Sequence, residues 1–194
     1  MKKAILILFI MLTITSIFAQ EKNYFYQIPA YPEKYTAENV AARMVDGLGF
    51  RYYWATEGLR NEDLDWSPGD KTRSSLATLE HILGLTTALV NAVNKRPTVT
   101  TPNAPTKLSY EQIRTKTLEN LKEASIILKH SDANLHDYKM IFQSPNRTSE
   151  YPFWNLINGP IADALWHVGQ VVSFRRSSGN PFPEGVNVLQ GKKN

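Results

Sequence analysis

The fold is indicated first by the stretch Leu108-Ser109-Tyr110-Glu111-Gln112-Ile113, which carries the clearest helix start in the chain. Ser109 is a favoured N-cap residue, and Gln112 three residues later completes a capping box, in which each of the two side chains accepts from the other residue's backbone N–H. Leu108 and Ile113 flank the cap and can pack on each other as a hydrophobic staple. The stretch therefore predicts a helix that reaches to about His130.

An amphipathic segment precedes this helix and begins at Thr36, which suits an N-cap. Apolar residues recur at spacings of three and four as far as Leu59, which indicates a helix with one buried face. Gly47 and Gly49 weaken the helical preference in its middle. The segment 61–73 carries turn residues and is expected to end the helix.

Two further helices are expected. The second helix in chain order starts at Ser74 or Ser75 and runs to about Asn94. The last helix runs from Asn155 or Pro160 to Ser178, followed by a glycine in the position that favours a helix end. Pro160 is either the first residue of this helix, where its missing N–H is harmless, or an interior kink that costs about 3 kcal/mol.

Four amphipathic helices in one domain of this size predict an all-α protein, a four-helix bundle over residues 36–181. Residues 20–35 show no helix or strand period and are expected to be an extended lead-in. Residues 131–153 form a long connection, in which a short strand is expected at 138–142. The tail 182–194 is expected to be irregular.

The first 19 residues have the order of a secretory signal peptide: Met1-Lys2-Lys3, an apolar run over residues 4–18, and Ala19. Cleavage is expected after Ala19, and these residues are left out of the fold. The apolar run is shorter than the roughly 20 residues of a membrane-spanning helix, so no stable span is expected after cleavage. A retained anchor is the alternative. The chain is therefore expected to be exported, to the periplasm or outside the cell.

Charge and cysteine content exclude some classes of function. Without Lys2 and Lys3, two of the 22 basic residues, the chain carries 20 basic against 18 acidic residues. These charges are scattered, so no nucleic-acid partner is expected. Arg175 and Arg176 are interpreted as solvated side chains that complement a helix C-terminus. The chain has no cysteine, so neither disulfides nor thiolate ligands contribute.

Asp163 and His167 are the residues with a metal-chelating spacing. They lie four apart on the last helix, so their side chains share one face. His81 lies inside the second helix and is the candidate third ligand. A bland interpretation stays open, in which His81 is a core histidine and the other two form a local hydrogen bond. His130 and His136 are assigned no role at the site.

Three segments resemble the motif regions of the DinB/YfiT-like family. They are Leu64-Asp65-Trp66-Ser67-Pro68, Leu76-Ala77-Thr78-Leu79-Glu80-His81-Ile82, and Asp163-Ala164-Leu165-Trp166-His167-Val168-Gly169-Gln170. The resemblance spans about Ala37 to Pro181. It implies a four-helix bundle that carries a divalent metal near one end.

In that family a histidine on the second helix and a His-x-x-x-His pair on the fourth bind the metal, typically zinc or nickel. His81 matches the first of these and His167 the last, but Asp163 stands where the family more often has histidine. Two histidines with one carboxylate also serve zinc hydrolases and non-haem iron enzymes, so iron is a third candidate. Gln170 is expected to support the metal ligands from outside the coordination sphere.

The resemblance implies a metal-dependent enzyme acting on a small molecule that the sequence does not identify. Some relatives are thiol-dependent transferases and isomerases, but export argues against cytoplasmic thiols and favours metal-assisted hydrolysis or transfer. A non-catalytic metal- or ligand-binding bundle is the alternative, and a homodimer formed through helix faces is a third. No general acid or base is assigned, because Glu80 faces away from His81.

Overall fold

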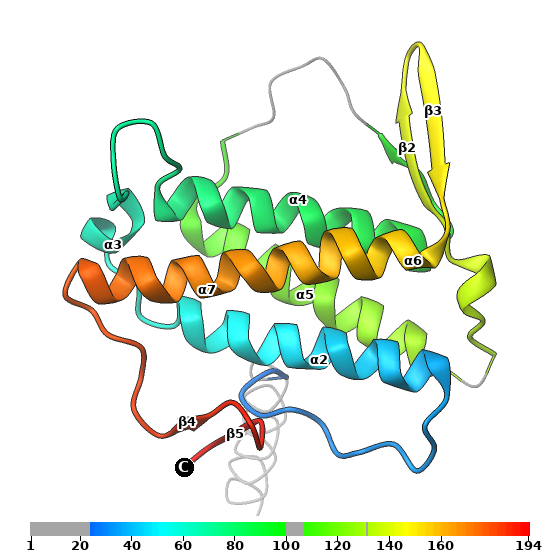
Figure 1. The fold of residues 1–194 in the computed structure, drawn as a ribbon, viewed down its shortest axis with the longest axis horizontal. Helices are drawn as coiled ribbons and strands as arrows, with labels where there is room; N and C mark the ends of the chain where they lie inside the picture. Colours follow the sequence, from blue (N-terminus) through cyan, green and yellow to red (C-terminus); the bar gives the residue numbers. More distant parts are fainter. Residues whose placement is uncertain (1–23, 100–106, 131) are drawn as a thin grey trace, which may run out of the picture.

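The computed structural model describes residues 24–99, 107–130 and 132–194, and this part of the chain is mostly helical, with two small sheets (Figure 1). The signal peptide expected at residues 1–19 lies outside the described residues. The helices are α2 (Ala37–Thr56), α3 (Asn61–Asp65), α4 (Ser75–Val93), α5 (Tyr110–Leu128), the 3-10 turn η1 (Leu135–Asp137), α6 (Phe153–Leu156), the π-helical segment η2 (Ile157–Ile161) and α7 (Ala162–Ser177).

The four long helices lie side by side, and each packs mainly on two others: α2 on α5 and α7, and α4 on α5 and α7. The side chains that meet between them form the apolar core. Its largest fully buried members on the four helices include Tyr52, Leu79, Ile82, Leu89, Ile113 and Leu121. Among the described helices, α4 alone is long and apolar enough to cross a membrane, and its packing between α5 and α7 accounts for that composition.

The helix starts expected from the sequence are confirmed. Thr36, Ser74 and Ser109 each accept a hydrogen bond from the backbone N–H three residues on, at 3.2, 3.2 and 3.3 Å. The capping box is also present, because Gln112 Oε1 accepts from the backbone N–H of Ser109 at 2.9 Å. These caps satisfy N–H groups that have no partner inside the helix.

The last helix begins before Pro160 and continues through it. α6, η2 and α7 follow one another without a break, and Pro160 lies inside η2. A proline has no N–H to donate and clashes with the preceding turn of an α-helix, whereas the wider π turn accommodates it. Asp163 is the second residue after this turn. The wider turn of η2 therefore sets the direction in which the side chains of Asp163 and His167 project from α7.

The connection 131–153 contains more structure than the sequence indicated. Strand β2 (Met140–Ser144) pairs antiparallel with β3 (Arg147–Tyr151), and β1 (Thr98–Val99) adds to β2 in parallel. The expected strand thus lies two residues further on, and β3 was missed because it is mostly exposed and lacks apolar alternation. A helix, α3, lies inside the expected turn segment.

The C-terminal tail forms a second small sheet from β4 (Val186–Asn187) and β5 (Lys192–Lys193). The tail folds back toward α2. It contacts the segment before that helix, where the backbone N–H of Ile28 donates to the carbonyl of Gly191 at 2.8 Å. Gly191 has a φ of 67°, and a Cβ there would meet the Ile28 side chain at 2.5 Å. Glycine is therefore required at this close approach.

Candidate metal centre

The structure brings together the three residues with metal-ligating chemistry. Nε2 of His81 lies 3.3 Å from Oδ2 of Asp163, and Nε2 of His167 lies 3.3 Å from Oδ1 of the same carboxylate. One ligand atom from each of the three residues can be chosen so that all lie within 4.8 Å of one another. The carboxylate therefore faces both imidazoles, one across the α4–α7 interface and one on its own helix.

Helix packing explains how these side chains meet. Asp163 and His167 are one turn apart on α7, so they share a face. That face lies against α4, which presents His81. The two imidazole rings meet edge to face with their centroids 4.7 Å apart.

Gln170 fixes the orientation of the His167 ring. Nδ1 of His167 lies 2.7 Å from Oε1 of Gln170. An amide oxygen only accepts, so Nδ1 carries a proton, and in the neutral imidazole Nε2 then presents a lone pair. That lone pair points toward Asp163, which also offers only acceptors when ionised. The supporting role expected for Gln170 thus has a defined contact.

The three ligand atoms suit a small divalent cation. With bonds of about 2.1 Å, neighbouring ligand atoms in a tetrahedral zinc site are roughly 3.4 Å apart. The two separations of 3.3 Å, each to a different oxygen of Asp163, are close to this spacing, and one atom from each residue can be chosen with all three within 4.8 Å of one another. The set of two imidazole nitrogens and one carboxylate oxygen is one that zinc, nickel and iron sites share.

The centre is open to solvent. The side chains of His81 and Asp163 are 33% and 40% exposed, whereas His167 is 14% exposed. Trp166, on the turn between Asp163 and His167, is 71% exposed. A small molecule can therefore reach the ligand side chains without opening the helix packing.

Other candidate residues lie elsewhere. His130 and His136 are exposed on the C-terminal side of α5 and in η1, outside the cluster. Within the described ranges, the group that could hold a metal ion consists of His81, Asp163 and His167 alone. The sequence interpretation of Arg175 was wrong: its side chain is buried, with 2% exposure, and donates to carbonyls at the end of α2.

A scan against protein-family models finds no match, and searches of curated proteins and of solved structures find no significant match. The site itself consists of two imidazoles and a carboxylate that converge, with one imidazole oriented by an amide.

Proposed function

We propose that the chain is a DinB/YfiT-like four-helix bundle and an exported, metal-dependent enzyme. The pairwise packing of α2, α4, α5 and α7 supports a bundle, and the three motif segments around Trp66, His81 and His167 support the family. The proposed ligands are His81 from the second long helix and Asp163 and His167 from the fourth.

One observation carries the metal proposal: in the neutral form of the His167 ring, its free lone pair and the Asp163 carboxylate converge on one point. Its Nδ1–H is used by Gln170, so its Nε2 and the Asp163 carboxylate are two acceptors 3.3 Å apart. Two acceptors at this distance repel each other unless a cation, either a proton on Nε2 or a metal ion, lies between them. A divalent ion held also by His81 resolves this contact.

The residues of the site then have distinct roles. Asp163 brings negative charge to the ion and links α7 with α4, while Gln170 holds the His167 ring in position. When bound, the ion supplies Lewis acidity, which favours hydrolysis or group transfer at a polar bond. The exposure of His81 and Asp163 leaves room for a small substrate. Zinc or nickel is the proposed ion, with iron as the alternative.

The alternative function is a non-catalytic bundle in which the ion ties α4 to α7. That function favours a closed coordination sphere with four protein ligands. Three protein ligands and a solvent-exposed side favour the enzyme.

Export is proposed from the signal-like order of residues 1–19. It places the substrate outside the cytoplasm. N-terminal sequencing of protein collected from the periplasm and the medium tests this, with cleavage expected after Ala19. An uncleaved N-terminus in the membrane fraction supports the retained anchor instead of cleavage, and uncleaved protein in the cytoplasm contradicts export.

The metal proposal is tested by elemental mass spectrometry on tag-free mature protein. About one zinc, nickel or iron ion per chain is expected, with loss of the metal in Asp163→Ala and His167→Ala. His130→Ala is the matched control, because it removes an imidazole outside the site. A wild-type protein that holds no metal and takes up none when it is added contradicts the proposal. An open site exchanges a bound ligand and a closed one does not. Visible spectroscopy of the cobalt-substituted protein monitors this exchange and so separates the two.

A further inference from the structure

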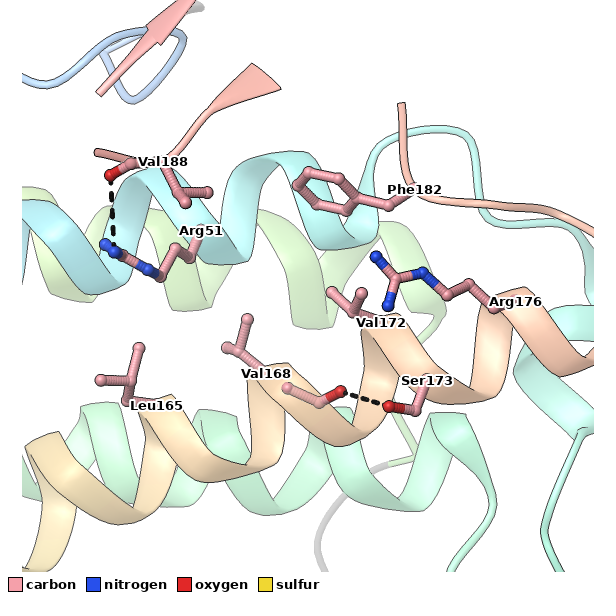
Figure 2. Close-up of a pocket in the computed structure, with 9 residues that line it drawn as sticks. Arg51, Leu165, Val168, Val172, Ser173, Arg176, Phe182 and Val188 are labelled. Carbon is pink, nitrogen blue, oxygen red and sulfur yellow. Dashed lines mark hydrogen bonds between the residues drawn. The ribbon is translucent and has the colours of Figure 1, made fainter. Parts of the chain in front are cut away.

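A cleft lies between α7, α2 and the C-terminal tail (Figure 2). Its volume is about 420 Å³. Val172, in its wall, comes nine residues after Asp163, which places it roughly 180° around the helix. The cleft is therefore separate from the proposed active site, and a ligand can bind in it whether or not the metal is present.

The wall of the cleft is mainly apolar. Leu165, Val168 and Val172 line it along α7, and Phe182 and Val188 line it from the C-terminal tail. Gly169 lies on the same face, and a Cβ there would meet nothing within 4 Å. The space beside the helix is thus open and can take several methylene groups.

Two guanidinium groups border this apolar wall. Arg51 reaches from α2 and donates to the carbonyl of Gly47 at 3.0 Å and to that of Val188 at 3.5 Å, which holds the tail in place. Arg176 lies beside Val172 and Phe182 in Figure 2. Over the part of the chain that the structure describes, neither forms an ion pair with a carboxylate.

The lining supplies no compensating negative charge. It contains no aspartate or glutamate, and its one hydroxyl, that of Ser173, already donates to the carbonyl of Gly169 at 3.1 Å. The cleft therefore combines an apolar wall with an unneutralised positive charge. An anion with an apolar body complements both features.

We propose that this cleft binds a single-chain amphipathic carboxylate. Arg176 receives the carboxylate, because its planar guanidinium offers paired donors that match a carboxylate's two oxygens. The chain lies along Val172, Val168 and Leu165, covered in part by the tail. A cleft of this volume holds one chain of about ten carbons. The ligand is a free fatty-acid-like molecule rather than part of a bilayer, since the apolar wall is shared between α7 and the tail rather than lying on one flat helix face.

The test is isothermal titration of the full mature chain with decanoate below its micelle concentration. Saturable binding of one decanoate per chain is expected. Arg176→Gln is expected to weaken it about tenfold, because a charge-assisted hydrogen bond is lost. Gly169→Leu keeps every charge but fills the open space, and is expected to abolish binding. Decanol, which has the same chain without the charge, should bind more weakly and be insensitive to Arg176→Gln.

Arg147→Gln is the matched control, since it removes an exposed guanidinium from the β2–β3 hairpin and should leave binding unchanged. Circular dichroism of each variant verifies that it folds. Equal decanoate affinity in the wild type, Arg176→Gln and Gly169→Leu overturns the proposal, as does the absence of binding. A wild-type dimer that Gly169→Leu dissociates, with no decanoate bound, also overturns it and identifies a second copy of the chain as the occupant. Decanoate bound only through co-sedimentation with anionic vesicles assigns the surface to a membrane and rejects the free ligand.

Discussion

Nδ1 of His167 and Oε1 of Gln170 lie 2.7 Å apart, within one turn of α7. The amide oxygen accepts a hydrogen bond from Nδ1–H, which leaves Nε2 of the neutral ring free to ligate. Such a partner also makes the imidazole a better ligand and holds the ring against rotation. Gln170 therefore orients a candidate metal ligand without itself belonging to the cluster of His81, Asp163 and His167.

Replacing Gln170 tests this orienting role directly. Gln170→Ala is expected to weaken zinc binding about 10- to 100-fold, because His167 loses the acceptor that fixes its tautomer. Gln170→Glu keeps an acceptor and is expected to bind zinc at least as tightly as the wild type. Affinities are measured by competition with a chromophoric chelator, and Gln190→Ala is the control. Equal weakening by alanine and glutamate contradicts the acceptor role and indicates that Gln170 only packs.

Arg175 joins the end of α7 to the end of α2. Its Nη1 atom donates to the carbonyls of Trp54, Ala55 and Glu57 at 3.2, 3.0 and 3.1 Å. Carbonyls in the last turn of a helix have no partner inside it, so Arg175 satisfies groups that would otherwise be buried alone. Burial lowers the pKa of Arg175, yet the side chain remains a hydrogen-bond donor to these carbonyls.

Arg175→Met keeps most of the side-chain volume but removes the donors. It is expected to lower the free energy of unfolding by about 3 kcal/mol, because buried carbonyls lose their partners. Arg176→Gln, the exposed neighbour, is expected to change it by less than about 0.5 kcal/mol. Urea unfolding followed by circular dichroism measures both. Similar effects of the two substitutions would mean that general charge at the helix end, not the specific contacts, provides the stability.

Local features of the structure were predictable from the sequence. The caps at Thr36, Ser74 and Ser109 depend on residues three apart, and the shared face of Asp163 and His167 depends on residues four apart. Each is encoded within one helical turn. The convergence of His81 with this pair follows from helix packing. The sequence offered His81 as a candidate because it lies inside another helix, and the family resemblance matched it to a ligand position.

Features that join distant parts of the chain were not predictable. Arg175 looked like an ordinary exposed arginine because its partners lie about 120 residues earlier. Strand β3 is held by its pairing with β2 and has no apolar period of its own. The cleft depends on the position of the tail beside α7, and no local pattern marks it.

Gly49 and Gly84 lie in the interiors of helices but have different surroundings. A Cβ on Gly49 would meet the Phe25 ring at 2.3 Å, whereas a Cβ on Gly84 would meet nothing within 4 Å. Gly49→Ala is therefore expected to destabilise the protein by about 1–3 kcal/mol through overpacking. Gly84→Ala is expected to stabilise it by up to about 1 kcal/mol, because alanine favours the helix. Thermal unfolding compares them, and stabilisation by both substitutions contradicts the close packing of Phe25 on α2.

Asp63 is a buried carboxylate that connects α3 to the segment after α7. Burial raises its pKa, but hydrogen bonds from Arg60, Ser178 and Asn180 outweigh this and hold the pKa well below its ordinary range. The contacts are short: Arg60 Nη2 lies at 2.8 Å, Ser178 Oγ at 2.6 Å and Asn180 Nδ2 at 2.6 Å from carboxylate oxygens. Its folded pKa is thus below that of the unfolded chain, about 3.9.

A depressed pKa means that Asp63 contributes stability that is fully present above about pH 5 and is lost as the pH falls below about 4 toward the folded pKa. Asp63→Asn is expected to lower the free energy of unfolding at pH 7 by about 2–3 kcal/mol, because the charge-assisted hydrogen bonds to the buried carboxylate are lost. The same variant should lose less stability than the wild type between about pH 5 and pH 3. Urea unfolding across this range measures the difference, with the exposed Asp65→Asn as control on the same helix. Parallel pH profiles for the wild type and Asp63→Asn would show that other carboxylates cause the acid sensitivity.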